Sequence, residues 1–244
     1  MEVLILHGKD LLECGIKKLG LAYTENQLNQ FMKYYDLLIE KNKVMNLTAI
    51  TDLDEVMVKH FLDSILIHNT IDVSKVNTLI DVGTGAGFPG IPLKIMFPHL
   101  KVTLVDSLNK RLKFLNSVIE ELSLEDVNTV HGRAEDLGHN IIYREKYDLC
   151  VSRAVANLST LSEYCIPFIK SDGLFISYKS ADSEQEINLS NNAVKILGCK
   201  ILKQEKITLP MSDVKRNIVI IIKEKKTPKK YPRKAGIPSK EPLK

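Results

Sequence analysis

One stretch of the chain, residues 79–90 with the sequence LIDVGTGAGFPG, constrains the fold more than any other. Its apolar start ends in Asp81, and four glycines follow within eight residues: Gly83, Gly85, Gly87 and Gly90. Glycine has no Cβ, so this backbone can turn tightly and approach a bound molecule closely. A strand followed by such a loop and then a helix is typical of α/β folds that bind nucleotide-like ligands. The sequence therefore predicts an α/β fold with a ligand site after this strand.

From about residue 76 the chain alternates between short β-type runs and amphipathic helical segments. Such alternation predicts a mostly parallel sheet with helices on both of its faces. Strands are expected at residues 78–82, 102–106, 127–130, 147–152, 174–178, 200–206 and 217–223. Only the turn-like LPMSD segment separates the last two strands, which predicts an antiparallel hairpin at the edge of the sheet.

The first 70 residues have a helical pattern of their own. Apolar residues at helical spacing predict a helix over residues 24–41, and Thr24 with Gln27 has the form of a capping box. A second helix is expected over about 54–68. The predicted division is an N-terminal helical extension (1–70), a core (71–224) and a C-terminal segment (225–244).

The positive charge of the chain is concentrated at its C-terminal end. Residues 223–244 carry nine Lys or Arg and two Glu, a net charge of +7, while the remaining residues have a net charge of −3. We expect this basic, proline-rich segment not to form a packed core and to bind a polyanion. A solubilising tail is an equally supported alternative.

The cysteines and the apolar runs exclude several classes of protein. The four cysteines, Cys14, Cys150, Cys165 and Cys199, are far apart and form no CxxC pair, which favours reduced thiols over a disulfide frame or a metal site. The longest aliphatic run near the C-terminal end, Ile218–Ile222, is far too short to span a bilayer. The start, MEVLILHGKD, lacks the features of a signal peptide. We therefore expect a cytoplasmic protein with no metal ion and no membrane segment.

The residues around the glycines argue against a dinucleotide. A literal GxGxxG pattern begins at Gly85, but this pattern alone is weak evidence. Asp81 precedes the glycines, and a pyrophosphate is disfavoured beside a carboxylate. Pro89 and Pro92 follow, and they remove backbone N–H groups that a phosphate would use. A ligand with an amino group or a sulfonium is favoured by the same carboxylate.

Residues at the ends of the next strands complete the predicted site. Asp106 ends the second strand, 21 residues after Gly85, where a carboxylate can accept hydrogen bonds from both hydroxyls of a ribose; a helix cap or turn is its alternative role. Ala134 and Glu135 follow the third strand, beside the expected adenine, and SRAVA (152–156) follows the fourth. Contacts at four successive strand ends suit S-adenosylmethionine, whose amine, ribose and adenine each meet one loop.

Several motifs occur in a fixed order from about residue 25 to the C-terminal end: NLTAI, KHFLDSI, DVGTGAGFPGIPL, VDS, GRAED, SRAVANL and YPRKAGIPSKEPL. Together they resemble the small-subunit ribosomal RNA methyltransferase G family, also called RsmG or GidB. The resemblance implies a Rossmann-like class I methyltransferase with a mostly parallel seven-stranded sheet. It also implies methyl transfer from S-adenosyl-L-methionine to N7 of a guanine in the 530 loop of bacterial 16S ribosomal RNA.

The predicted cofactor-binding residues are Asp81, Gly83, Gly85, Phe88, Asp106, Ala134, Glu135 and Arg153. The family resemblance implies Gly83, Phe88, Arg153 and the backbone around 134–135, whereas Asp106 rests on the ribose argument. Replacing Arg153 with Ala is expected to lower cofactor affinity. One departure is Lys179-Ser180, where the family commonly has Lys-Gly, and it puts the local turn in doubt.

The predicted RNA-binding residues are Asn46, Arg133, Lys179 and Arg233. N7 of guanine has a free lone pair and no proton, so no general base is expected and no catalytic residue is assigned. N7 lies in a groove of A-form RNA that side chains cannot read, so the target must lie in a loop or be flipped out. His60 and Arg216 are interpreted as structural, and Cys150 as a small buried hydrophobe.

The predicted partner is 16S ribosomal RNA, alone, in an assembly intermediate or in the small subunit. Deleting residues 225–244 is expected to weaken RNA association and to leave cofactor affinity unchanged. Two alternatives from other classes are an NAD-dependent oxidoreductase and a non-catalytic RNA-binding module. The first would need a second nucleotide-binding half, and the intact strand-end positions argue against the second.

Overall fold

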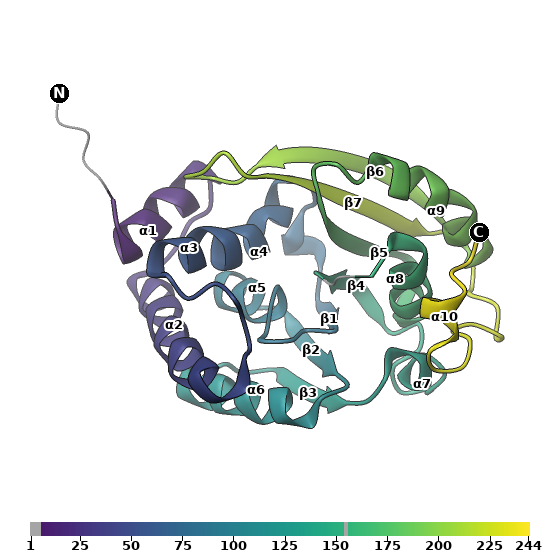
Figure 1. Cartoon of the computed structure of the whole chain (residues 1–244), viewed down its shortest axis with the longest axis horizontal. Helices are drawn as coiled ribbons and strands as arrows, with labels where there is room; N and C mark the ends of the chain where they lie inside the picture. The colour runs from purple at the N-terminus through teal and green to yellow at the C-terminus, as the bar shows by residue number, and fades with distance from the viewer. Residues whose placement is uncertain (1–5, 154–155) are drawn as a thin grey trace.

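The computed structural model describes residues 6–153 and 156–244 of the chain (Figure 1). The helical elements are α1 (Gly8–Lys18), α2 (Glu25–Met45), α3 (Leu53–Val56), the π-helical η1 (Met57–Leu62), α4 (Asp63–Ile65), the 3-10 turns η2 (Leu66–Asn69) and η3 (Val73–Lys75), α5 (Gly90–Met96), α6 (Asn109–Glu121), α7 (Ala134–Leu137), α8 (Leu158–Cys165), the 3-10 turn η4 (Ile166–Phe168), α9 (Glu184–Ile196) and α10 (Ile237–Lys240). The strands are β1 (Thr78–Val82), β2 (Lys101–Asp106), β3 (Val127–His131), β4 (Tyr147–Ser152), β5 (Ile169–Ser180), β6 (Cys199–Thr208) and β7 (Lys215–Lys223).

The strands form a seven-stranded sheet in the order β3-β2-β1-β4-β5-β7-β6. The strands β1 to β5 pair with one another in parallel, and β7 is antiparallel to both β5 and β6. The α/β class and the late antiparallel hairpin are thus confirmed. The second strand of this hairpin, β7, lies inside the sheet, and its first strand, β6, forms the edge. The order reverses between β1 and β4, and ligands of such sheets bind beyond the carboxyl ends of the strands at this point.

Alternate residues of the central strand divide the core between the two faces of the sheet. Leu79 of β1 joins a cluster with α1, α2, α5 and α6, whereas Ile80 and Val82 join a second cluster with α8 and α9. Figure 1 shows the same division, with α1 to α6 on one side of the sheet and α7 to α10 on the other. Both faces are covered, as the apolar composition of a parallel strand requires.

The N-terminal helices belong to the first of these clusters. The predicted capping box of α2 is present, because Thr24 Oγ1 accepts a hydrogen bond from Gln27 N (3.2 Å) and Gln27 Oε1 accepts one from Thr24 N (2.8 Å). The helix ends at Asn46, which has a left-handed backbone with φ of 50°. The buried side chains of α2, with Phe31 and Tyr34 among them, share one core with β1 and β2. The predicted domain boundary at residue 70 stays a prediction.

The second predicted helix is interrupted by a π-helical turn. The wider turn of η1 shifts the backbone hydrogen bonds of residues 57–62, and such turns occur preferentially at functional sites. The carbonyl oxygens of Lys59 and His60 accept hydrogen bonds from Arg153 Nη1, each at 3.3 Å. A side chain from the end of β4 thus reaches the backbone of this turn.

The C-terminal segment differs from expectation, because residues 225–244 pack against the core. Thr227, Tyr231 and Pro238 are buried, and Tyr231 joins the second apolar cluster. The expectation that this segment forms no packed part of the molecule is therefore wrong. Most of its positive charge is carried by exposed lysines, whereas Thr227, Tyr231, Pro232 and Pro238 are buried.

No helix in the described parts of the chain is long and apolar enough to cross a membrane. Nor do three or more His, Cys, Asp or Glu side chains of residues 6–153 and 156–244 come together as a possible metal site.

Candidate active site

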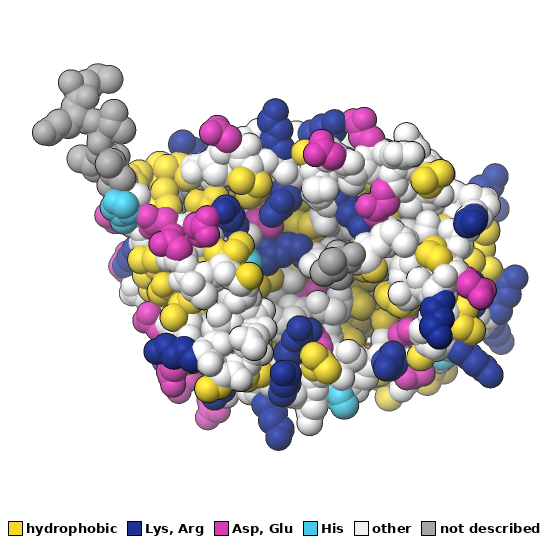
Figure 2. Space-filling view, in the orientation of Figure 1, with side chains coloured by type: hydrophobic (Ala, Val, Ile, Leu, Met, Phe, Trp, Pro, Cys, Tyr) yellow, Lys and Arg dark blue, Asp and Glu magenta, His cyan; other side chains and the backbone are white. Residues whose placement is uncertain are grey.

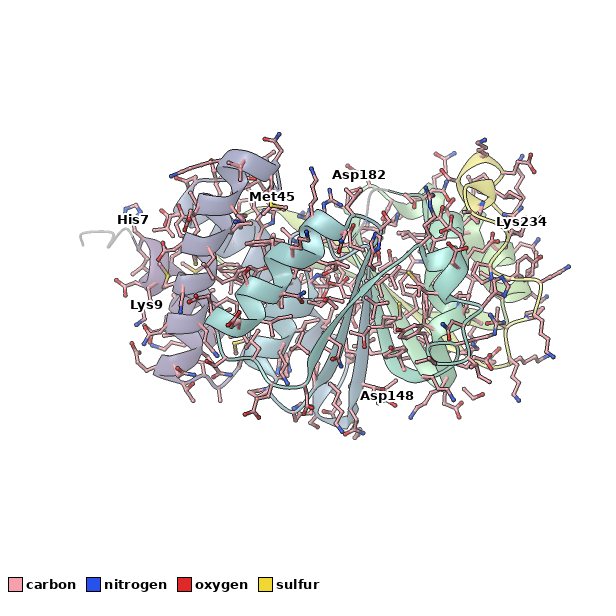
Figure 3. The ribbon with its side chains drawn as sticks, turned by 90° about the horizontal axis from the view of Figure 1, so that it is seen from below. His7, Lys9, Met45, Asp148, Asp182 and Lys234 are labelled. Atoms are coloured by element: carbon pink, nitrogen blue, oxygen red, sulfur yellow. The ribbon has the colours of Figure 1, made fainter. Side chains whose placement is uncertain are left out.

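A cleft of about 260 Å³ lies at the carboxyl ends of β1 to β4. Figure 2 looks onto this edge of the sheet and shows a hollow near the middle of the face. Figure 3 shows that Met45, Asp182 and Lys234 lie toward this edge, whereas Asp148 lies at the opposite one. The residues that line the cleft are Val82, Gly83, Val105, Asp106, Ser107, Gly132, Arg133, Ala134, Glu135, Ala156, Leu161 and Tyr164.

Four of the predicted cofactor residues line this cleft: Gly83, Asp106, Ala134 and Glu135. They come from three successive strand ends that are far apart in the sequence. The predicted RNA-binding residue Arg133 lies on the same rim, at the N-cap of α7. The fourth strand end contributes Ala156, whereas Ala154 and Val155 of the SRAVA motif lie outside the described residues.

The glycine loop folds back over the end of β2. The backbone N–H groups of Gly83 and Thr84 both donate to the carbonyl oxygen of Val105, at 2.9 and 3.0 Å. Gly83 has φ of 75° and Gly85 has φ of 61°, a left-handed conformation that favours glycine. Gly83 is exposed at the cleft, so the loop presents bare backbone there.

Asp106 connects the end of β2 to this loop. Its Oδ2 accepts hydrogen bonds from Gly85 N at 3.0 Å and from Arg111 Nη1 at 3.3 Å, and its Oδ1 accepts one from Leu108 N at 2.8 Å. The carboxylate is almost buried yet lines the cleft. Asp106 therefore stabilises a turn, which was its alternative interpretation, and it also lies where its carboxylate can reach a ribose.

Asp81 lies beneath the loop and is not among the residues that line the cleft. Its Oδ2 accepts hydrogen bonds from Thr84 Oγ1 (2.7 Å) and from Gly90 N (2.9 Å), so it caps the first turn of α5. Burial raises the pKa of this carboxyl to about 6. Oδ1 is buried and has no partner among the described residues. Direct contact between Asp81 and a ligand amine stays a prediction, but the observed contacts give Asp81 a role in shaping the loop.

Phe88 and Arg153 meet in a second cluster, on the side of the N-terminal helices. The Phe88 ring stacks on His60 with centroids 4.6 Å apart, and the Arg153 guanidinium carbon lies 5.0 Å from the Phe88 centroid. Neither Phe88 nor Arg153 lines the cleft described above. Their predicted contact with the cofactor stays untested, and their visible contacts join the glycine loop to η1.

Sequence reasoning missed Asp63, a fully buried residue at the centre of this second cluster. Its Oδ2 accepts a hydrogen bond from Arg153 Nη1 at 2.8 Å, and its Oδ1 accepts one from Arg216 Nε at 2.9 Å. The carboxylate thus joins the N-terminal helices to β4 and β7. The available signal was an acidic residue within the KHFLDSI motif, where the neighbouring residues predict a buried helical face.

His60 is held as a neutral side chain between Thr48 and Arg153. A guanidinium can only donate, so Nδ1 of His60 accepts from Arg153 Nη2 (3.3 Å) and Nε2 donates to Thr48 Oγ1 (2.8 Å). Burial, together with the positive charge of Arg153, lowers the pKa of His60 to about 3. Thr48 belongs to the NLTAI connector, so His60 links this connector to the Phe88 ring.

This neutral histidine predicts a pH dependence of folding stability. The unfolded state protonates His60 below its ordinary pKa of about 6.5, whereas the folded state stays neutral until about pH 3, so stability falls as the pH falls through this window. Between pH 7 and 5, the wild type should lose about 2 kcal/mol more free energy of unfolding than His60→Gln. Asp81, whose pKa is raised, acts in the opposite sense in both proteins.

Urea unfolding at a series of pH values measures this difference in slope. His131→Gln, which removes an exposed histidine, serves as the control and should keep the wild-type slope. Equal slopes for His60→Gln and the wild type would show that His60 is not held neutral.

The four predicted RNA-binding residues fall into two groups. Asn46 and Arg133 are exposed, and neither side chain has a partner among the described residues. Lys179 is buried and donates to Ala156 O at 2.7 Å, with Glu186 also 2.7 Å away. Arg233 forms a bidentate ion pair with the buried Glu163. Because the last two cations are already neutralised, we carry only Asn46 and Arg133 into the RNA-binding proposal.

The sheet order, the glycine loop and the cleft define a class I methyltransferase fold. Two solved structures share this fold with a TM-score of 0.50: the YcgJ protein from Bacillus subtilis, which is 14% identical and aligns over 68% of this chain and 100% of its own, and TrmN from Thermus thermophilus, which is 11% identical and aligns over 68% and 53%. At such identities the likeness concerns the fold alone.

The chain belongs to the rRNA small subunit methyltransferase G family, whose model matches residues 27–219. Relatives named ribosomal RNA small subunit methyltransferase G agree along nearly the full length. The protein of Alkaliphilus metalliredigens is 53% identical over 98% of this chain and 100% of its own, and that of Acetivibrio thermocellus is 54% identical over 96% of both. The family predicted from the motifs is confirmed.

Proposed function

We propose that this protein transfers a methyl group from S-adenosyl-L-methionine to N7 of a guanine in the 530 loop of 16S ribosomal RNA. Family membership supports methylation of small-subunit ribosomal RNA. The observation that carries the cofactor assignment is the single cleft that brings together Gly83, Asp106 and Ala134. A bacterial ribosomal RNA substrate, alone or in an assembling subunit, also implies action in the cytoplasm.

The residues of the cleft match the chemistry of this cofactor. Gly83 offers bare backbone for close approach, Asp106 offers a carboxylate acceptor for ribose hydroxyls, and Leu161 adds apolar surface beside Ala134. The cofactor supplies a methyl group that its sulfonium already activates. The protein then has to hold that group in line with the acceptor atom, at about 3 to 3.5 Å.

Methylation of N7 does not require the protein to transfer a proton. N7 carries a lone pair and no proton, so the reaction needs orientation rather than a base. His60 agrees with this requirement, because a side chain whose pKa is lowered to about 3 is a poor base near neutral pH. We therefore assign no proton transfer to His60, and Phe88 and Arg153 stay proposed contacts of the cofactor.

Two exposed residues, one on the rim of the cleft and one at the end of α2, offer contacts for a single-stranded RNA loop. Arg133 is exposed on one side and provides a guanidinium for a phosphate. Asn46 is exposed at the end of α2, at the start of the connector that Thr48 fastens to His60. Such contacts suit a target base that has been displaced from its stack.

Calorimetry with S-adenosylhomocysteine and NAD separates the proposal from the oxidoreductase alternative. We expect binding of S-adenosylhomocysteine and none of NAD. Asp106→Ala should weaken S-adenosylhomocysteine binding by about tenfold or more, because it removes a charged acceptor from the cleft. Asp136→Ala, which changes an exposed carboxylate nearby, should leave the affinity unchanged. Binding of NAD alone would refute the proposal.

The methylated atom is identified by mass mapping of 7-methylguanosine in 16S ribosomal RNA from cells with and without this protein. A mark in the 530 loop that depends on the protein is expected. An unchanged map would contradict the proposed reaction, and a mark elsewhere would correct its target.

A further inference from the structure

The wall of the cleft that lies farthest from the N-terminal helices is formed by two short helices. α7 contributes Ala134 and Glu135, and α8 contributes Leu161 and Tyr164. α7 is a single turn of four residues, and helices this short have no stability of their own. Contacts from outside α7 must therefore fix its position.

The C-terminal segment supplies such contacts to α7. The backbone N–H of Gly236 donates to Glu135 Oε1 at 3.0 Å. His139 Nε2 donates to Pro232 O at 2.6 Å, just after the helix. The backbone of Gly138 lies so close to Pro232 that a Cβ at position 138 would be 2.7 Å from the proline ring. The same carboxylate that lines the cleft is therefore bonded to the C-terminal segment behind it.

The same segment is bonded to α8. Arg233 Nε and Nη2 donate to the two carboxylate oxygens of Glu163, at 2.9 and 2.7 Å, and the Arg233 backbone N–H donates to Oε1 at 2.7 Å. Thr160 Oγ1 donates to Pro238 O at 2.9 Å. Glu163 is fully buried, so its charge depends on the arginine of the C-terminal segment.

A third contact fastens the start of the segment to the loop after α7. Arg144 Nη1 donates to Gly138 O (2.7 Å) and Tyr231 O (2.9 Å), while Nη2 donates to Thr227 O (2.8 Å). Residues 227–241 are thus bonded to α7, to α8 and to the connection that follows α7. The hydrogen bonds that this segment makes with α7, α8 and Arg144 come from its backbone and from Arg233, whereas Lys229, Lys230, Lys234 and Lys240 are exposed.

We propose that residues 227–241 form a strap that positions α7 against α8 and thereby sets the affinity of the cleft for its cofactor. This inference rests on the proposed binding of the cofactor in that cleft. It replaces the expectation that loss of the C-terminal segment spares cofactor affinity. Arg233 acts on the cofactor through Glu163 and α8, so it is a positioning residue.

The strap is tested with Arg233→Gln, measured by calorimetry with S-adenosylhomocysteine and by hydrogen exchange without ligand. We expect about tenfold weaker binding, because an unpaired buried carboxylate displaces α8, and faster exchange of the amides of residues 134–138. Arg233→Lys should recover part of the affinity. Thr160→Val, which removes one neutral hydrogen bond to the strap, is the milder second variant and should show a smaller loss.

The matched controls are Lys229→Gln and Lys234→Gln, which remove exposed charges from the same segment. Both variants should keep wild-type cofactor affinity and wild-type exchange. If either substitution has an effect, it should be on RNA binding. Wild-type affinity and exchange in both Arg233→Gln and Thr160→Val would overturn the strap. Failure of the wild type itself to bind S-adenosylhomocysteine would instead overturn the proposed cofactor site. Hydrogen exchange of residues 134–138 in Arg233→Gln would still test whether the strap positions α7.

Discussion

Replacing Asp63 with Asn is expected to lower the free energy of unfolding by about 3 kcal/mol. The substitution keeps the size of the side chain and removes its charge. Arg153 and Arg216, whose guanidinium groups both bind this carboxylate, then share a neutral amide. Removing one member of a buried ionic cluster is costly because the remaining charges stay desolvated without a partner.

The structural position of Asp63 extends this effect to the active site. Arg153 packs on the Phe88 ring and bonds the π-helical turn, so its displacement loosens the junction between the glycine loop and the N-terminal helices. We therefore expect Asp63→Asn to lose methyl transfer activity at temperatures where the variant is still folded. The cleft that carries the cofactor proposal does not include Arg153, so a loss confined to kcat would place Arg153 on the acceptor side, whereas a higher KM for the cofactor would support its predicted cofactor contact.

Urea unfolding followed by circular dichroism measures the change in stability. Asp182→Asn is the matched control, since Asp182 is exposed, and it should stay within about 0.5 kcal/mol of the wild type. In the Asp63→Asn background, Arg153→Met should be far less harmful than in the wild type, because it removes a cation that is already unpaired. A loss of less than about 1 kcal/mol in the free energy of unfolding of Asp63→Asn would show that water solvates the two arginines in place of the carboxylate.

The strands and the glycine loop could be predicted because their signals are local. A short strand such as β1, with the sequence TLIDV before the glycines, is recognisable in the sequence, and its burial follows from the helices on both faces. The capping box of α2 also depends on two residues three positions apart, and the structure contains both of its hydrogen bonds. These features are set by short stretches of sequence, and the tertiary structure did not override them.

The features that sequence reasoning missed depend on pairs that are distant in the chain. Asp63 and Arg216 are separated by 153 positions, and Glu163 and Arg233 by 70. The separation of Arg233 from Glu163 also explains why the charge of the C-terminal segment was misinterpreted. In the sequence alone, Arg233 looks like part of a free basic tail, because its partner lies far away in the chain. Net charge reports on possible partners in solution, but it does not show which cations are already neutralised within the fold.

Replacing Gly87 with Ala is the second large effect that we expect, at about 3 kcal/mol of lost stability. Gly87 has φ of 103°, which L residues rarely adopt. A Cβ there would lie 2.5 Å from the Tyr34 hydroxyl and 2.9 Å from both Ile91 Cγ1 and Leu115 Cδ2. The strained backbone and the overpacked core therefore add to each other at one position.

Gly20→Ala separates these two contributions, because Gly20 also has a positive φ (72°) but a Cβ at this position would have no atom within 4 Å. It should cost about 1 to 2 kcal/mol, the contribution of the backbone conformation alone. The Tyr34 hydroxyl donates to Ala86 O, so the loop can yield to an alanine at position 87 only by breaking this bond and moving Phe88. Gly87→Ala should therefore also weaken S-adenosylhomocysteine binding, whereas Gly20→Ala should not. Equal losses of stability in the two variants, with equal cofactor affinity, would show that the contact between α2 and the glycine loop does not constrain the site.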